Sequence, residues 1–324
     1  MKDKIALASK GAFMGIAEAI PGVSGGTIAF ITGIYQELIE TIKSITPVNL
    51  SLILSDPKGF WQAINGKFLL TLLVGMFGGL VFGILVISHL LETQKEILWG
   101  FFFGLVMASA LFLAKDVKWS PKAILFGLGG ALLSFFITGI APADGSDNLL
   151  YIFFAGSIAV SALMLPGISG SFILLLFGLY HTVVGSLKSV LKMDFTTDQL
   201  LIVATMTAGV LVGLFSFARV LSYLFKNYEQ STMACLIGVL LGSLNKICPW
   251  KLIETAYDKA ADKIVTINTI ALPDPEEFKI VSEINLLPTQ YQLHGDPQTT
   301  WVIVAAIAGF SLIGLLGYFD RSTE

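Results

Sequence analysis

The chain has 324 residues, of which 55% are hydrophobic and only 13% are charged, and its formal net charge is −3. Soluble domains carry about 25% charged residues, so this chain has too few charges to cover a water-facing surface. The negative balance argues against nucleic-acid binding, and two cysteines exclude a disulfide framework. We therefore expect an all-α polytopic membrane protein, in which Cys235 and Cys248 lie too far apart along one helix to pair.

The first 45 residues form an apolar segment with a broken centre. Within residues 5–45 the chain reads "AIPGVSGGTIAFITGIYQ", which places a proline, glycines and hydroxyl groups between two apolar stretches. Irregular backbone at membrane depth is tolerated only where it is buried in protein or lines a wet cavity. The pattern fits either a re-entrant hairpin or two short spans. Because Lys10 and Glu18 interrupt the apolar run, we interpret this region as mature structure and not as a signal peptide.

The rest of the chain contains apolar runs that approach the length of a membrane span, about 20 residues for a helix. We predict spans at 68–91, 97–114, 122–141, 199–225, 231–247 and 299–319. A second broken segment, 150–190, contains "MLPGISGSFILLLFGLYH". The polar stretch 250–298 holds eight acidic residues and four lysines. It is predicted to be an extracytoplasmic insertion, which either shapes an outer mouth or is a tolerated loop.

The two broken segments belong to a duplicated plan. A shift of 145 residues aligns Pro21 with Pro166, Gly22 with Gly167, Ser24 with Ser169, Gly25 with Gly170, Gly33 with Gly178 and Tyr35 with Tyr180. Each half, 1–145 and 146–324, is a broken segment followed by three spans. The number of crossings per half is therefore odd, and the second half must enter the membrane from the opposite face. This predicts an inverted-topology repeat, the plan of many secondary transporters.

The orientation follows from the lysines and arginines of the short loops, which gather on the cytoplasmic side. The loop 142–149 carries two aspartates and no cation, so we place it outside, and the loop 115–121 with two lysines inside. Counting from these loops puts both termini in the cytoplasm and 250–298 outside. We expect a multi-pass protein of the cytoplasmic membrane.

The broken segments are suited to hold an anion. A helix that begins at mid-membrane presents unpaired N–H groups and a partial positive charge, and such ends bind phosphate. Two copies that enter from opposite faces can bring two of these ends together near the midplane. The predicted phosphate-binding residues are Ser24, Gly25, Gly26, Thr27, Ser169, Gly170 and Ser171. The alternative is a glycine-rich packing turn without a ligand.

Ionisable side chains within membrane segments are functional candidates. Arg219 offers a planar fork for phosphate; alternatively it reaches toward the inner headgroups. A carboxylate at Glu18 would repel a neighbouring phosphate unless it were protonated or bound to a cation, so it is a candidate coupling site for H⁺ or Na⁺, or else a structural partner. His89, which the duplication places opposite Arg219, and also Glu37 and His181 are further candidates for coupling or gating. We predict no metal site and no other cofactor.

The segments "EAIPGVSGGTIAFITGIYQ" and "LPGISGSFILLLFGLYH", together with the three-span halves, resemble the polyprenyl-phosphate transporter family, PopT, formerly a domain of unknown function. The resemblance covers nearly the whole chain, and the insertion least. It implies a flippase that returns undecaprenyl phosphate, the lipid carrier of cell-wall precursors, from the outer to the inner leaflet. The family motif carries onto Pro21–Thr27 and Pro166–Ser171. The expected partners are this lipid and the bilayer, and a homo-oligomer is left open.

Three rival functions are weighed against this one. A lipid phosphatase would need a nucleophile or metal cluster beside acid–base partners, whereas the three histidines are dispersed and no HExxH or cysteine cluster occurs. We therefore do not expect an enzyme. A transporter or channel for a small anion stays open on the sequence alone. A purely structural scaffold is disfavoured, because paired broken segments serve no packing need.

Overall fold

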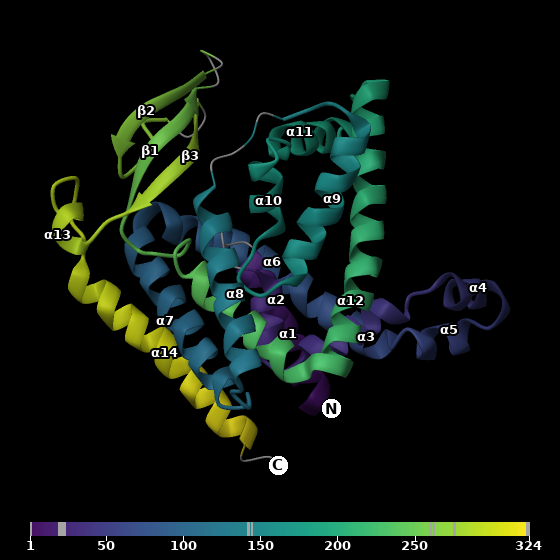
Figure 1. The fold of residues 1–324 in the computed structure, drawn as a ribbon. Helices are drawn as coiled ribbons and strands as arrows, with labels where there is room; N and C mark the ends of the chain where they lie inside the picture. Colours follow the sequence, from purple (N-terminus) through teal and green to yellow (C-terminus); the bar gives the residue numbers. More distant parts are fainter. Residues whose placement is uncertain are drawn as a thin grey trace.

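The computed structural model describes residues 2–18, 24–140, 143, 145–258, 261, 263–274 and 277–321. Its helices are α1 (Lys2–Glu18), α2 (Gly25–Ile31), α3 (Tyr35–Ser44), α4 (Pro47–Ser55), α5 (Pro57–Ala63), α6 (Gly66–Thr93), α7 (Lys95–Ala114), α8 (Pro121–Gly139), α9 (Leu149–Met164), α10 (Gly170–Leu176), α11 (Tyr180–Leu191), α12 (Thr197–Ser243), α13 (Pro288–Tyr291) and α14 (Thr299–Arg321). Its strands are β1 (Lys251–Asp258), β2 (Lys263–Thr269) and β3 (Phe278–Asn285). The predominantly helical body confirms the predicted fold class (Figure 1).

The first broken segment folds back on itself as a hairpin of α1 and α2. The end of α1 meets the start of α2, since the Gly25 N–H donates to Glu18 Oε1 at 2.7 Å. The middle of α1 meets the end of α2, since Lys10 Nζ donates to the Thr32 carbonyl at 2.7 Å. With seven residues, α2 is only about 10 Å long and too short to span a bilayer. The backbone thus reverses direction at the motif, and the choice between a re-entrant hairpin and two short spans stays a prediction.

The second broken segment repeats this backbone at the spacing of 145 residues. α10 (Gly170–Leu176) has the bounds of α2 after the shift. Each short helix ends at a glycine with positive φ, +74° at Gly33 and +66° at Gly178, a conformation that favours glycine. Each end is closed by the same 3.0 Å bond, from Ile34 N to Ala29 O and from Leu179 N to Leu174 O, as in a Schellman motif. We call residues 2–44 the first hairpin and 149–191 the second.

Four helices among the described residues are long and apolar enough to cross a membrane: α6 over Gly66–Val86, α7, α8 and α12. α12 has 47 residues, but Tyr228 has non-helical dihedral angles (φ −140°, ψ 39°). This break falls between the predicted spans 199–225 and 231–247. α14 is apolar over Thr299–Gly314. These helices confirm a multi-pass membrane protein.

Glycines let each hairpin pack closely against the span that follows it in the repeat. The contacts are Gly11 with Leu72 and Gly15 with Met76 between α1 and α6, and Gly209 with Phe153 and Gly213 with Ser157 between α12 and α9. A methyl group at these glycines would overlap the facing backbone, so small residues set the close approach of the helices. The residue numbers rise together within each pair, so both pairs run parallel.

The last span of each half packs against the middle span of the other half. The contacts are Gly100 with Val302 and Gly104 with Ala306 between α7 and α14, and Gly238 with Gly127 and Gly242 with Ala131 between α12 and α8. Both pairs are again parallel. Since successive spans within a half alternate in direction, the last spans of the two halves must then run in opposite directions. An inverted repeat requires last spans that run in opposite directions. The inverted repeat itself remains a prediction.

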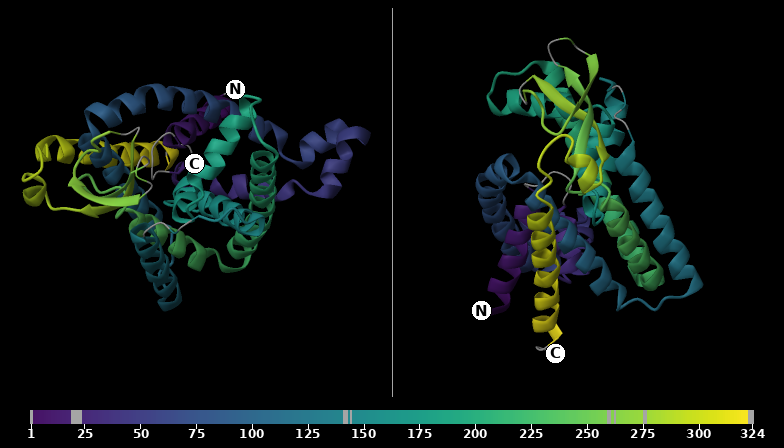
Figure 2. Two further views of the ribbon diagram at one scale, coloured as in Figure 1. Left: turned by 90° about the horizontal axis from the view of Figure 1, so that it is seen from above. Right: turned by 90° about the vertical axis from the view of Figure 1, so that its left-hand side faces the viewer.

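The 250–298 insertion contains a feature that the sequence did not predict, a three-stranded antiparallel sheet of order β2-β1-β3. The sheet lies at one end of the molecule, and the start of α1 and the end of α14 lie at the other (Figures 1 and 2). This arrangement agrees with termini and insertion on opposite sides of the membrane. Which side faces the cytoplasm remains a prediction.

Candidate functional site

The two motif segments meet in the core of the protein. Ser24 Oγ donates to the Leu163 carbonyl at 3.1 Å, and the Gly167 N–H donates to Thr27 Oγ1 at 2.8 Å. Ser24 and Thr27 are each only 1% exposed. Residues 19–23, which include Pro21 and Gly22 of the first motif, lie outside the described residues. Within the described residues, these two hydrogen bonds nevertheless join segments that lie about 140 residues apart in the sequence.

In the first hairpin, the chain itself occupies the start of α2. Ser24 is the N-cap residue and its Oγ accepts from the Gly26 N–H at 3.1 Å. The Glu18 carboxylate accepts from the Gly25 N–H at 2.7 Å. Two of the free N–H groups of this helix end are thus satisfied, one of them by a negative charge. Glu18 therefore stands where an external anion would bind.

The second hairpin lacks both of these caps. Ser169 is the N-cap residue of α10 but makes no capping bond with its side chain. Its Oγ lies 2.8 Å from Ser171 Oγ, and Ser171 is exposed. The residue that corresponds to Glu18 is Leu163, which has no charge. A pair of hydroxyl groups is therefore available here, beside Gly170, which packs against α9.

A lysine that the sequence did not single out lies next to the second motif. Lys246 Nζ is 4.9 Å from the ring centre of Phe172, the residue that follows Ser171. The same ammonium group pairs with Glu283 of β3 at 3.1 Å. Lys246 therefore connects the insertion to the second hairpin at the residue that follows Ser171. Its position at the end of a predicted span was the only available signal.

A buried ion pair lies within the insertion where it meets α7, since Lys251 Nζ is 5.5 Å from the ring centre of Trp99. Lys251 Nζ lies 3.3 Å from Glu283 Oε2, and the two side chains are 5% and 12% exposed. Burial lowers the pKa of Lys251 to about 8, against the attraction of Glu283. Burial acts to raise the pKa of Glu283, but the nearby Lys251 and Lys246 outweigh it and lower that pKa to about 2. Tyr291 adds a 2.6 Å bond to Glu96 of α7.

Tyr35 joins the two hairpins. Its hydroxyl donates to the Met164 carbonyl at 2.8 Å in a buried position. Its ring makes edge contacts with Phe30 and with Phe225 of α12, at centroid distances of 5.3 and 5.9 Å. The repeat had revealed Tyr35 as a matched position, but no role could be predicted for it.

Arg219 is exposed on α12, and Nη1 donates to the Phe215 carbonyl at 2.6 Å, one turn earlier. No described contact brings it to either motif. A polar residue of α12 that faces the first hairpin is Ser222, 3% exposed. Its Oγ accepts from Lys43 Nζ at 2.6 Å and bonds to Glu40. The sequence did not single out this polar contact between α3 and α12.

Of the remaining candidates, the structure describes the side chain of Glu37 but not those of His89 and His181. Glu37 is exposed, accepts from Asn65 Nδ2 at 3.0 Å and lines a cavity between α1, α3 and α6. Within the described part of the chain, no three His, Cys, Asp or Glu side chains gather as a metal site. Cys235 and Cys248 are free thiols, as predicted.

Comparison with known proteins identifies the family. Residues 14–265 match the family model described as undecaprenyl phosphate translocase-like. This chain belongs to that family. It is 41% identical over 244 residues to the polyprenyl-phosphate transporter of Vibrio cholerae serotype O1, covering 75% of this chain and 77% of the relative. It is 31% identical over 255 residues to the polyprenyl-phosphate transporter of Staphylococcus aureus, covering 74% and 84%. No solved structure matches it.

The part shared with the translocase-like family contains most of the site. The range 14–265 includes both motif segments, Tyr35, the contact around Ser222, and Lys246. It omits the first turns of α1, all of β3 and α14. Glu283, which holds Lys246, therefore lies beyond the shared part.

Proposed function

We propose that this chain is a non-enzymatic transporter that carries undecaprenyl phosphate, or a similar polyprenyl phosphate, from the outer to the inner leaflet of the cytoplasmic membrane for reuse in cell-envelope synthesis. Membership of the translocase-like family and two relatives named polyprenyl-phosphate transporters support the substrate. The observation that carries the proposal is the buried contact of Ser24 and Thr27 with Leu163 and Gly167. This contact supports a single headgroup site to which both motifs contribute.

The headgroup binds first at the second motif. The hydroxyl groups of Ser169 and Ser171 can donate to phosphate oxygens, and Lys246 supplies a charge on the side of the insertion. Charge-assisted bonds of this kind are about twice as strong as neutral ones. Arg219 is retained as a predicted second contact of the headgroup. The apolar tail stays in lipid, through a lateral opening between the halves.

Movement into the first motif requires displacement of Glu18. A phosphate and the Glu18 carboxylate compete for the Gly25 N–H, and their like charges repel. A proton or a Na⁺ ion at Glu18 removes the repulsion and weakens the carboxylate as an acceptor. In this proposal the ion and the lipid phosphate therefore cross together, which couples transport to an ion gradient. His89 and His181 stay candidates for gating.

A reconstituted assay tests the proposal. Purified protein is placed in liposomes that contain a fluorescent polyprenyl phosphate, and an impermeant quencher reports the fraction exposed outside. We expect wild type to exchange the lipid between leaflets, and Ser169→Ala with Ser171→Ala to slow this exchange about tenfold. Ser161→Ala is the matched control, since its hydroxyl bonds within α9.

Two results would contradict the proposal. One is wild-type protein that leaves the lipid in its original leaflet under any imposed H⁺ or Na⁺ gradient. The other is uptake of inorganic phosphate at a rate that polyprenyl phosphate does not inhibit, which would instead establish the small-anion transporter.

A further inference from the structure

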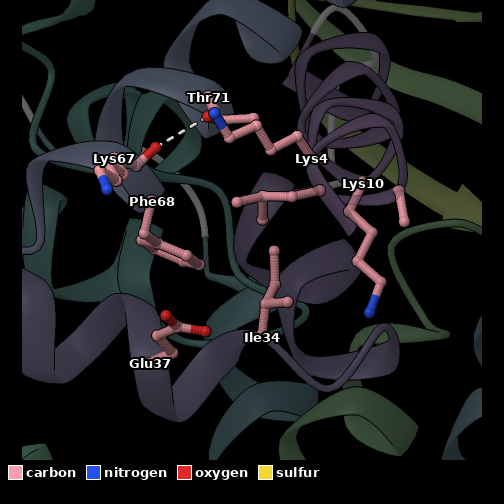
Figure 3. Close-up of a pocket in the computed structure, with 9 residues that line it drawn as sticks. Lys4, Lys10, Ile34, Glu37, Lys67, Phe68 and Thr71 are labelled. Atoms are coloured by element: carbon pink, nitrogen blue, oxygen red, sulfur yellow. Dashed lines mark hydrogen bonds between the residues drawn. The ribbon is translucent and has the colours of Figure 1, made fainter. Parts of the chain in front are cut away.

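A cavity of about 420 Å³ lies beside the first hairpin, between α1, α3 and α6 (Figure 3). We propose that this cavity is a second binding site for the phosphate headgroup of a membrane amphiphile whose apolar chain lies along α6. The identity of that amphiphile as a polyprenyl phosphate rests on the proposed function. The site itself is argued from the residues that line the cavity.

The charge of the cavity selects an anion. Its lining includes Lys4, Lys10 and Lys67 but only one acidic residue, Glu37. The carboxylate of Glu37 already has a donor, since it accepts from Asn65 Nδ2 at 3.0 Å. A phosphate monoester carries about −1.5 to −2 at neutral pH, which matches the formal surplus of two positive charges.

The lysines have donors to spare. Lys10 Nζ gives one bond to the Thr32 carbonyl, and an ammonium group has three donors. Lys4 and Lys67 are exposed, and neither forms an ion pair within the described part of the chain. Figure 3 shows these side chains coming from two different helices around one opening. Binding one phosphate would require these flexible side chains to turn toward the opening, since Figure 3 shows their ammonium groups on different sides of it.

The apolar parts of the cavity favour an amphiphile over free phosphate. Ile34 and Phe68 line it and are 7% and 4% exposed. Beyond the cavity, α6 exposes Leu70, Leu73, Val74 and Phe77, which share one face at helical spacing. A prenyl chain attached to a phosphate in the cavity can follow this face into the bilayer.

The cavity and the first motif lie at opposite ends of α2. Glu18 bonds to Gly25 at the start of this helix, and Lys10 bonds to Thr32 at its end. α2 has seven residues and is about 10 Å long. A headgroup that leaves the motif therefore finds a second site at the next positively charged opening. Lys4 and Lys10 precede residue 14, where the family match begins, so this part of the site is argued from this chain alone.

The experiment uses a farnesyl phosphate that carries a photoreactive diazirine at the end of its chain. Full-length protein in detergent is labelled with this probe, and the labelled peptides are mapped. We expect labelling on residues 66–77 of α6. Lys4→Gln with Lys67→Gln should lower this labelling affinity about tenfold, and Glu37→Gln should raise it about threefold, because it removes the opposing charge.

The matched control is Lys58→Gln with Lys115→Gln, which removes the same charge at exposed positions outside the cavity and should change affinity less than about twofold. Equal loss in this control would show a bulk charge effect and overturn the inference. Inorganic phosphate that displaces the probe as well as unlabelled farnesyl phosphate does would overturn the amphiphile. Labelling at the motifs without labelling of α6 would overturn the site.

The outcome is separable from the proposed function. Ser169→Ala with Ser171→Ala should slow lipid transport in liposomes about tenfold and leave labelling of α6 intact. Labelling of α6 without transport in wild type would refute the proposed function and keep the cavity as a lipid-phosphate site. Transport by wild type without labelling of α6 would refute the cavity as a lipid-phosphate site and keep the proposed function.

Discussion

The two hairpins share one backbone and differ in their polar contacts. In both, a seven-residue helix ends at a glycine of positive φ and is closed by the same hydrogen bond. In the first, Glu18 and Ser24 satisfy the start of the short helix. In the second, Ser169 Oγ bonds to the exposed hydroxyl of Ser171 and makes no capping bond. The turn is thus the same in both hairpins while the polar contacts differ, and under the proposed function the first motif is closed by its own carboxylate and the second is open to the headgroup.

The largest effect is expected where a side chain would separate the second hairpin. A Cβ at Gly170 would lie 2.7 Å from the Ala159 carbonyl, a backbone atom. Gly170→Val should therefore abolish lipid exchange in liposomes. The matched control is Gly185→Val on α11, where no atom lies within 4 Å of the added Cβ. Near-normal exchange in Gly170→Val would show that the close contact of α9 and α10 is dispensable.

Alanine at the matched glycine of the first hairpin should have a milder effect. A Cβ at Gly25 would meet the Glu18 carboxylate, the far end of a flexible side chain, at 2.8 Å. Gly25→Ala should displace Glu18 and reduce the dependence of transport on the ion gradient more than the rate itself. Glu18→Gln, which keeps an acceptor but removes the charge, should abolish that dependence. Glu229→Gln, an exposed carboxylate on α12, is the control; a gradient response retained in Glu18→Gln would remove Glu18 from coupling.

Acid should loosen the second hairpin from the insertion and spare the first. The pKa of Glu283 is about 2 in the folded protein, below its ordinary value of 4.5. Its stabilising contribution is therefore complete above about pH 4.5 and is lost as the pH falls toward 2. Limited proteolysis of the sheet should become faster between pH 5 and pH 3 by about tenfold. In Glu283→Gln the pH dependence should be largely absent, and an unchanged dependence would contradict the role of this ion pair.

Tyr35→Phe should weaken the contact between the hairpins. The substitution removes a buried donor and leaves the Met164 carbonyl with one partner fewer, a loss of about 1 to 2 kcal/mol in the free energy of unfolding. Thermal denaturation in detergent measures it. Tyr151→Phe, which removes a half-buried bond within the second hairpin, should cost less, and the reverse order would count against Tyr35 as the main connection.

The smallest expected effect is the difference in stability between Ser24→Ala and Ser169→Ala, the substitutions of the two matched serines. Ser24→Ala removes a helix cap and should lower stability by about 1 kcal/mol. Ser169→Ala removes no cap, so the midpoint of thermal unfolding should stay within error while the KM for polyprenyl phosphate rises. Equal destabilisation by both substitutions would show that the second serine is structural.

The repeated hairpins and the spans were predictable because they depend on local patterns. Proline and glycine mark the turns, and long apolar runs mark the helices, including the break in α12 near Tyr228. The contacts of the site were less predictable, because they join distant residues. Tyr35 and Met164 are 129 positions apart, and Lys246 and Glu283 are 37 apart.

The sequence also could not predict which residues of a span face the protein and which face the lipid. The hydrophobic residues of α12 are spread around the helix, so its periodicity gives little contrast between a lipid face and a protein face. Ala218 and Ser222 are 0% and 3% exposed, whereas Arg219, adjacent to Ala218, is exposed. Charge alone made Arg219 a candidate. The sheet was also not predicted, because its strands lie in a polar stretch and pair across loops.

The contact between the two motifs is tested most directly by cross-linking. In a background with Cys235→Ser and Cys248→Ser, we would introduce Ser24→Cys with Leu163→Cys, where Ser24 Oγ lies 3.1 Å from the Leu163 carbonyl. A short thiol cross-linker should join them within one chain and stop lipid exchange until it is cleaved. Ser24→Cys with Ser157→Cys, on the face of α9 toward α12, should not be joined. Failure of the first pair to cross-link, or full exchange by the cross-linked protein, would contradict a shared site.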